Sequence, residues 1–299
     1  MYRLKRLRGG GMAVHNSAYG ETMHPLLAPW AEANRLYVQG GDLAALLTDG
    51  AAGEAVVFDV GLGAAANALA ALHCHRQLLG RNRAVRPLRL ISFEADPAAL
   101  RFAIDQAPAL EYPRGHEATL QALLDDGCAS LPGGARWELR LGDFTRLIHD
   151  EPARADLIFF DPFSPRSNPE MWRVSTLEGL YRCRRPGAAT RLVTYSSAIA
   201  IRAALLLAGF YAGEGPRLGP QHRTTAAATH LSALAEPLTK GWLARWRHAR
   251  EPWPPLTRVA EHKRARETLL AHPQWSHEGL PAPRPSVARR GPRRSGRRR

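Results

Sequence analysis

Residues 55–69 read AVVFDVGLGAAANAL, an apolar run followed by a glycine-containing turn and then by an alanine-rich segment. The apolar run Ala55–Val60 has the length and the β-branched content of a buried strand, and glycines end it. From Ala64 to Leu79 the chain is rich in Ala and Leu, which favours a helix. A buried strand joined to a helix by a glycine turn predicts the first half of a βαβ unit.

The same alternation continues along the chain. Apolar runs predict further strands at 88–93, 136–141, 156–160 and 190–195, and two weaker ones at 210–213 and 229–235. Helical patterns cover 26–47, the segment after Pro97, 115–126, 167–182 and 197–208. Together they predict an α/β protein with a mostly parallel seven-stranded sheet and helices on both faces. In such a sheet, ligands bind at the carboxyl ends of the strands.

Positive charge is concentrated at the two ends of the chain. Of the net charge of +14, residues 240–299 supply +12 and Arg3, Lys5, Arg6 and Arg8 supply +4, so the body is nearly neutral. We expect a flexible basic N-terminus over 1–14, an α/β domain over 15–236, a weakly structured helical extension over 237–280 and a disordered Arg-rich tail over 281–299. Basic ends attract nucleic acid, but they also simply keep a protein soluble, and charge alone leaves both readings open.

Composition argues against a membrane protein and against a metal site. No stretch approaches the roughly 20 apolar residues of a membrane span, and the start MYRLKRLRGGG lacks the apolar core of a signal peptide. Three scattered cysteines, Cys74, Cys128 and Cys183, fit a reducing cytoplasm. His73 and His75 flank Cys74, but no second pair follows at zinc-finger spacing, so we interpret them as one helix surface and expect no metal.

Four predicted strands end on an acid or have one just beyond the end, namely Asp59, Glu94, Asp143 and Asp161. Each acid alone is typical of a helix cap or a solvated loop. Parallel strands, however, bring all four to one edge of the sheet. There, Glu94 can accept both hydroxyls of a ribose, and Asp143 can accept a hydrogen bond from an adenine amino group. The pattern favours a ligand that contains adenosine.

NAD and S-adenosylmethionine both contain adenosine, and the glycine turn does not separate them. Gly61 and Gly63 let backbone approach a ligand, and Ala66 at the sixth position is compatible with a dinucleotide fingerprint. The segment Asp161-Pro162-Phe163 favours S-adenosylmethionine, because it offers an acid beside a methyl sulfonium and an aromatic wall that can face a cation. A dehydrogenase would show a proton relay of His, Tyr or Lys, and the sequence offers none.

These motifs, in this order, resemble the methyltransferase component of the MnmC family, which completes 5-methylaminomethyl-2-thiouridine at the tRNA wobble position. The resemblance runs from about Ser17 to Ala235. Its most specific part is DPFSPRSNPEMW at 161–172, and it also includes SAYGETMH at 17–24, FE at 93–94, TYSSA at 194–198 and the glycine loop with Gly61, Gly63, Asn67 and Leu69. Two departures stand out. The third glycine of the family's loop is Ala65, which is acceptable only if its φ is negative, and a basic pair near 222 reads His222-Arg223.

The resemblance implies a Rossmann-like fold and a stand-alone methyltransferase domain over 15–236, without the FAD-dependent oxidase. It implies S-adenosylmethionine as cofactor, the tRNA anticodon region as partner, a cytoplasmic location and a functional partnership with the enzymes that install the aminomethyl group. The site residues that it implies fall into three sets. Catalysis involves Asp161, Phe163 and Tyr195; cofactor binding involves Asp59, Gly61, Gly63, Asn67, Glu94, Asp143 and Asp161; substrate binding involves Tyr19, Glu21, His24, Asn168, His222 and Arg223.

Two other classes of function remain open at this point. The chain could methylate another RNA or a small-molecule amine, which the departure at His222 and Arg223 allows. It could also be a non-catalytic module that binds the cofactor or RNA.

For Trp172, we favour a structural role, in which it anchors the helix behind the loop, over stacking on a base.

Overall fold

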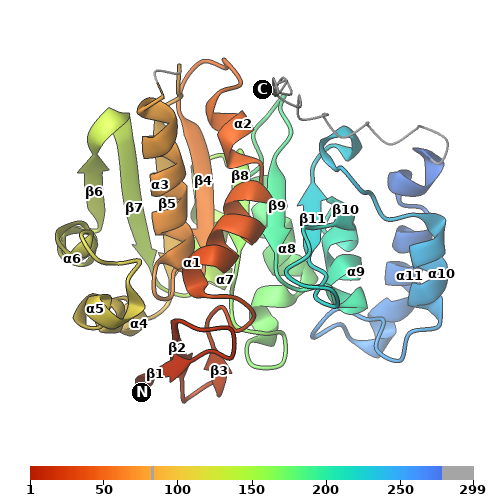
Figure 1. Ribbon diagram of the computed structural model, residues 1–299. Coiled ribbons are helices and arrows are strands. Elements are labelled where there is room, and N and C mark those ends of the chain that lie inside the picture. Colours follow the sequence, from red (N-terminus) through yellow and green to blue (C-terminus); the bar gives the residue numbers. More distant parts are fainter. Residues whose placement is uncertain (82–83, 278–299) are drawn as a thin grey trace, which may run out of the picture.

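The computed structural model describes residues 1–81 and 84–277, and its centre is an eight-stranded sheet (Figure 1). The strand order is β10-β11-β9-β8-β4-β5-β7-β6. Neighbouring strands from β9 to β7 are parallel, whereas β11 and the edge strand β6 run antiparallel to their neighbours. The bounds are β4 Ala55–Val60, β5 Leu88–Glu94, β6 Cys128–Leu131, β7 Ala135–Leu141, β8 Leu157–Phe160, β9 Arg191–Thr194, β10 Tyr211–Glu214 and β11 Thr225–Ala228.

The alternation of strands and helices predicted the α/β class and the mostly parallel sheet, and both are confirmed. Two details of the strands differ from the prediction. The sheet has an eighth strand, β6, because Gly127 turns the chain and Cys128–Leu131 pairs back along β7. The last strand is Thr225–Ala228 rather than 229–235, which instead contains a short 3-10 turn at Leu231–Ala233. Its run of alanines has little β propensity, so pairing between β9 and β10 decides its conformation.

Helices cover both faces of the sheet, and each face has its own hydrophobic core (Figure 1). One core joins the sheet to the N-terminal helices, to α3 and to α6; the other joins it to α7, α8 and α9. The helices on the side of the first core are α1 Pro29–Glu32, a π-helix Ala33–Gln39, α2 Leu43–Leu47, α3 Ala66–Leu79, α4 Ala98–Asp105, α5 Ala107–Leu110 and α6 Glu117–Asp126. The helices on the side of the second core are α7 Phe144–Asp150, α8 Val174–Arg182 and α9 Ile199–Leu207, with a 3-10 turn at Pro169–Trp172.

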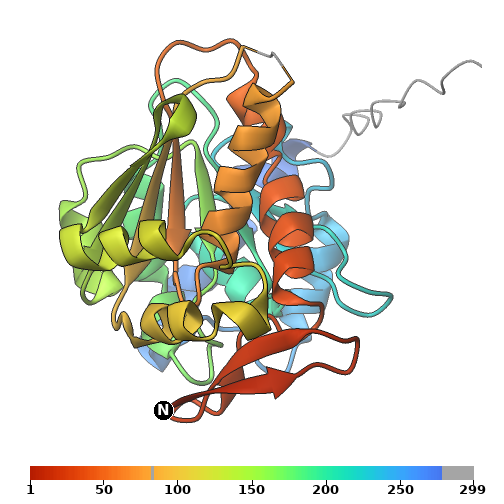
Figure 2. The same ribbon diagram turned by 60° about the vertical axis from the view of Figure 1, so that its left-hand side comes forward.

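The N-terminal segment is ordered, which corrects the expectation of a flexible residue range 1–14. Strands β1 Tyr2–Arg6, β2 Met12–Asn16 and β3 Glu21–Thr22 form a three-stranded antiparallel sheet (Figure 2). Tyr2, Leu4 and Met12 pack against a small core with Val14, Ala64, Ala103 and Leu110. The alternation of apolar and basic residues in β1 therefore reflects a strand with one buried side rather than a free arm.

The segment expected to be a weakly structured extension, 237–280, is a packed layer as far as the structure describes it. Helices α10 Lys240–Arg247 and α11 His262–Leu270 and a 3-10 turn at Pro273–His277 bury three tryptophans against α9 and β10. Gln274 strengthens the contact, because its side chain bonds both backbone groups of Ala212 at 2.8 Å. The tail expected at 281–299 lies outside the described residues. In the described part of the chain, no helix is long and apolar enough to cross a membrane.

Candidate active site

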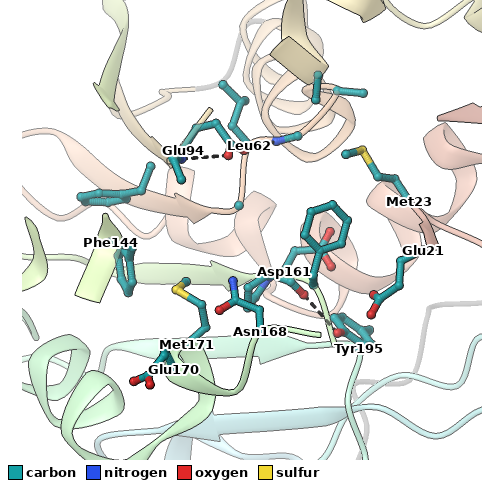
Figure 3. Close-up of a pocket in the computed structure, with 18 of the residues that line it drawn as sticks. Glu21, Met23, Leu62, Glu94, Phe144, Asp161, Asn168, Glu170, Met171 and Tyr195 are labelled. Carbon is teal, nitrogen blue, oxygen red and sulfur yellow. Dashed lines mark hydrogen bonds between the residues drawn. The ribbon is translucent and has the colours of Figure 1, made fainter. Parts of the chain in front are cut away.

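A cavity of about 920 Å³ opens where the parallel strands end at their carboxyl edge. It collects residues from the N-terminal sheet, the glycine turn, and the loops after β5, β7 and β8 (Figure 3). Sequence-predicted residues that line it are Glu21, His24, Gly61, Gly63, Glu94, Asp143, Asp161, Phe163, Asn168 and Tyr195. Segments that are far apart in the sequence therefore meet at the edge of the sheet that the strand ends indicated.

The glycine turn after β4 forms part of the cavity wall, and a side chain would clash with backbone at Gly61 and crowd Met23 at Gly63. Gly61 has a φ of +89°, and a Cβ there would lie 2.7 Å from the carbonyl oxygen of Asp161. Gly63 has a φ of +51°, and a Cβ there would meet Met23 Sδ at 3.1 Å. Ala65 differs from the expectation, because its φ is +65° rather than negative. The helix α3 begins directly after it, so this alanine is held in the left-handed region by the turn.

Glu94 stands at the end of β5 and is fixed by backbone. Its Oε2 accepts from the amide of Gly63 at 2.8 Å, and its Oε1 accepts from the amides of Ala95 and Asp96 at 2.8 and 3.2 Å. Burial raises the pKa of Glu94, although these amide donors oppose the rise. Carboxylate oxygens have lone pairs left for further donors, so Glu94 can still accept from ligand hydroxyls.

Asp161 extends from the end of β8 toward the cavity, on the same side of the turn as Asn67. The side-chain amide of Asn67 donates to Asp161 Oδ2 at 2.8 Å. Burial raises the pKa of Asp161, and the charge of His24, the hydroxyl of Tyr37 and the amide of Asn67 oppose that rise. Asp161 is therefore a carboxylate that Asn67 holds in place and that faces the cavity, where a ligand can reach it.

His24 lies between two carboxylates. Its Nε2 is 3.9 Å from Asp161 Oδ2, and its Nδ1 is 3.7 Å from Glu32 Oε1. Burial works against a charged imidazole, but Glu32, Asp161 and Asp59 outweigh it and raise the pKa of His24. Glu32 also accepts from the backbone amides of Leu26 and Leu27, which ties the segment that carries His24 to α1.

The loop 161–172 is held rigidly by two side chains that donate to its backbone. Tyr195 donates from its hydroxyl to the carbonyl of Pro162 at 3.0 Å, and Trp172 donates from Nε1 to the carbonyl of Phe163 at 2.8 Å. Trp172 is fully buried and packs edge-on against Phe160 and Tyr195. The structure thus gives Trp172 an anchoring position, and it leaves the Phe163 ring and the Tyr195 side chain as cavity walls.

The N-terminal sheet contacts the same loop from the other side. Glu21 accepts from the backbone amide of Ser164 at 3.0 Å and from the hydroxyls of Ser164 and Ser167. Burial alone would raise the pKa of Glu21, but these donors lower it. Tyr19 does not line the cavity; its ring stacks on that of Phe163, with centroids 4.5 Å apart. Asp143 lies on the rim, where it caps α7 by accepting from the amide of Thr145 at 2.9 Å.

Five of the sequence-predicted residues do not line the cavity, namely Tyr19 and the four that follow. Asp59 is fully buried and does not line the cavity; it accepts from the Ser92 hydroxyl at 2.8 Å, and burial raises its pKa to about 7. Asn67 is 3% exposed and supports Asp161 from beneath. His222 and Arg223 are exposed in the loop between β10 and β11, outside the cavity, and Arg223 lies 3.5 Å from Glu214.

Some residues of the cavity were not singled out from the sequence. Glu32, Met23 and Tyr2 line it, and Glu32 is 3% exposed. The one available signal was an acid within the apolar helical stretch PWAEANRLYV, where a buried carboxylate needs a partner. Nothing in the sequence marked Tyr2 as a cavity residue, because it reaches the cavity only through the pairing of β1 in the separate N-terminal sheet.

The residues of the cavity fit S-adenosylmethionine. Gly61 and Gly63 line the cavity, so the backbone of the turn can lie close to a ligand, and the half-buried Glu94 offers an acceptor for ribose hydroxyls. Asp161 and the aromatic walls are suited to a cationic methyl donor and an amine. Among the described residues, no group of three or more His, Cys, Asp or Glu side chains is placed to hold a metal ion.

Comparison with known proteins agrees with this interpretation. Residues 120–230 match the model of an S-adenosyl-L-methionine-dependent methyltransferase family. The chain is 30% identical over 226 residues to the tRNA 5-methylaminomethyl-2-thiouridine biosynthesis bifunctional protein MnmC of Paracidovorax citrulli, covering 71% of this chain and 33% of that one. It is 30% identical over 239 residues to MnmC of Stutzerimonas stutzeri, covering 76% and 34%. This chain thus spans about one third of the length of these relatives.

A solved structure, MNMC2 from Aquifex aeolicus, shares the fold with a TM-score of 0.66 and 22% identity, over 91% of this chain and 83% of that one. The fold and the site therefore define a methyltransferase that depends on S-adenosylmethionine. More particularly, the predicted resemblance to the methyltransferase component of MnmC is confirmed by these two relatives.

Proposed function

We propose that the chain transfers a methyl group from S-adenosylmethionine to the aminomethyl group of 5-aminomethyl-(2-thio)uridine at the tRNA wobble position, giving 5-methylaminomethyl-(2-thio)uridine. The observation that carries the proposal is Asp161, a carboxylate at a strand end, supported by Asn67 and set in the loop 161–172. The names of the MnmC relatives, which concern tRNA 5-methylaminomethyl-2-thiouridine biosynthesis, support the choice of substrate. The proposal places the protein in the cytoplasm, beside the enzymes that install the aminomethyl group.

S-adenosylmethionine supplies an electrophilic methyl group, which an amine takes by in-line displacement. For the protein, the task is to bind and orient. Gly61, Gly63 and Glu94 would hold the cofactor, with Asp143 on the rim near its adenine. Phe163 and Tyr195 would exclude water and face the positive charge at the reacting atoms.

The amine must be neutral to react, because an alkylammonium with a pKa of about 10 has no free lone pair. Asp161 accepts hydrogen bonds from the amine N–H groups and so aims the lone pair at the methyl group. Because burial raises the pKa of Asp161, this carboxylate is also a better proton acceptor than an exposed one. His24, within 3.9 Å of Asp161 and 3.7 Å of Glu32, lies where a proton can pass out of the site through a small movement or one water.

The test is methylation of tRNA that carries 5-aminomethyl-2-thiouridine, with labelled S-adenosylmethionine. Asp161→Asn keeps an acceptor for Asn67 and removes the charge, so we expect a rate at least about 100-fold lower with cofactor affinity largely retained. Asp150→Asn, on the exposed end of α7, is the matched control and should act like the wild type. Full activity of Asp161→Asn would contradict the assigned role.

A second experiment tests the substrate. Mass spectrometry of wobble uridines in total tRNA from a deletion strain should show accumulated 5-aminomethyl uridine. An unchanged profile would mean that the enzyme acts on another RNA or another amine. Calorimetry with S-adenosylmethionine then separates an enzyme with a different substrate from a chain that binds no cofactor.

A further inference from the structure

Four cations project from one end of the N-terminal sheet. Arg3, Lys5, Arg6 and Arg8 are exposed, while Tyr2 and Leu4, which alternate with Arg3 and Lys5, pack inward. Within the described residues, none of the four cations forms an ion pair with a carboxylate. Lys5 donates to the Thr22 hydroxyl at 3.3 Å. Unpaired cations on a rigid strand are available to an external anion, since no internal carboxylate must be displaced first.

The hairpin that carries these cations lies at one end of the molecule (Figure 2), and its residue Tyr2 lines the active-site cavity. Tyr2 of β1 and Glu21, Thr22 and Met23 at β3 line the cavity, and the cations continue from there along β1 to the turn. Alternate residues of a strand are about 7 Å apart, so Arg3 and Lys5 form a short row on one side. Their charge is felt locally, because it adds to the effect of burial in lowering the pKa of the neighbouring His15.

Other features of the mouth extend the same surface. Arg166, in the loop 161–172 that Glu21 of the N-terminal sheet contacts, is exposed and has no ion pair among the described residues. On the far side of the hairpin lies a second hollow of about 510 Å³ that Arg6, Trp30 and Tyr112 help to line. Cations beside aromatic rings are suited to the phosphates and bases of a nucleic-acid strand.

We propose that this surface, defined as Arg3, Lys5, Arg6 and Arg8 of the hairpin together with Arg166, binds the phosphates of the RNA on either side of the nucleotide that enters the cavity. The proposal rests on the proposed function for the presence of RNA and adds where and how the RNA is held. An enzyme that modifies a base must take it out of the stack, and contacts to flanking phosphates hold the strand while it does so. The exposed, unpaired cations on the segments next to the cavity would provide those contacts without reading sequence.

The experiment compares two charge-matched variants of the full chain. The hairpin variant is Arg3→Gln, Lys5→Gln, Arg6→Gln and Arg8→Gln; the control variant is Arg245→Gln, Arg247→Gln, Arg264→Gln and Arg266→Gln, exposed residues of α10 and α11. Both variants have four positive charges fewer than the wild type, so they differ only in where the charges were. Thermal unfolding and calorimetry with S-adenosylmethionine establish that both are folded and bind cofactor.

Fluorescence anisotropy with an unmodified anticodon stem-loop RNA gives the readout at several salt concentrations. We expect about tenfold weaker binding by the hairpin variant at about 0.1 M salt, and a slope of log K against log salt that is smaller by about 0.7 for each phosphate that the variant no longer neutralises. Arg166→Gln should reduce the slope by about 0.7, the value for a single phosphate. An RNA affinity and a slope equal to those of the control variant would overturn the proposal, as would hairpin-dependent binding of poly-glutamate as tight as that of RNA.

The binding assay does not depend on methylation, so the two proposals fail separately. If the chain does not methylate aminomethyl uridine but the hairpin variant still loses RNA binding, the surface stands and the substrate is wrong. If methylation is confirmed and the hairpin variant keeps the wild-type KM for tRNA, the surface is wrong. With both proposals correct, the hairpin variant raises the KM for tRNA and leaves kcat within about twofold.

Discussion

Gly61 joins the cofactor side of the cavity to the catalytic loop, and replacing it by alanine tests that connection. The residue has a φ of +89°, and an added Cβ would lie 2.7 Å from the Asp161 carbonyl oxygen and 3.0 Å from its carbonyl carbon. Both neighbours are backbone, so they cannot rotate away as a flexible side chain could. Relief requires that the start of the loop 161–172 moves by several tenths of an ångström.

The size of the effect follows from two separate costs. An L-residue in the left-handed region costs about 1–2 kcal/mol, and a methyl group forced into packed structure costs about 1–3 kcal/mol more. We therefore expect Gly61→Ala to lower the free energy of unfolding by about 2–5 kcal/mol. Gly53→Ala is the matched control, because Gly53 has a φ of +83° but open space around its Cβ, and it should show only the first of the two costs.

Urea unfolding measures both variants, and methylation and calorimetry measure the site. Because an error of about 1 Å in the position of a reacting group costs about 100-fold, the shift at Asp161 should lower kcat of Gly61→Ala about tenfold. Gly53→Ala should retain wild-type kcat and cofactor affinity. Equal destabilisation of the two variants together with full activity of Gly61→Ala would refute the coupling between the glycine turn and Asp161.

Two further predictions concern stability. Ala65→Gly should raise the free energy of unfolding by about 1 kcal/mol, because φ is +65° and glycine removes the left-handed penalty at some cost in unfolded-chain entropy. Urea unfolding measures the change. A decrease in the free energy of unfolding would mean that the alanine methyl group contributes packing. Burial lowers the pKa of His272 to about 4, so the unfolded chain takes up a proton first as pH falls below about 6.5, and stability decreases from there down to about pH 4. His272→Asn should remove about 2 kcal/mol of this acid-dependent decrease, after allowance for solvent screening, and parallel pH dependences of the two proteins would contradict it.

Local sequence was sufficient for the parallel sheet and for the edge at which the site lies. The run Ala55–Val60 is apolar except for Asp59, which indicates a strand buried on both faces, and helical patterns alternate with such strands along most of the chain. Once strands are parallel, their carboxyl ends coincide, so Glu94 and Asp161 could be placed together without knowing a single contact. The stiff loop 161–172 was also visible, because its prolines restrict the backbone locally.

Tertiary structure decided which side chains reach the cavity and what the chain ends do. Asp59 and Asp161 both mark strand ends, but Asp59 lies beneath the turn and bonds Ser92, whereas Asp161 faces the ligand. Glu32 and the β1–β2 hairpin joined the site through contacts between segments distant in sequence. The physical reason is that periodicity records which face of an element is buried, whereas the partner that buries it depends on the assembled fold; a basic strand end therefore looks the same in sequence whether it is free or docked beside an active site.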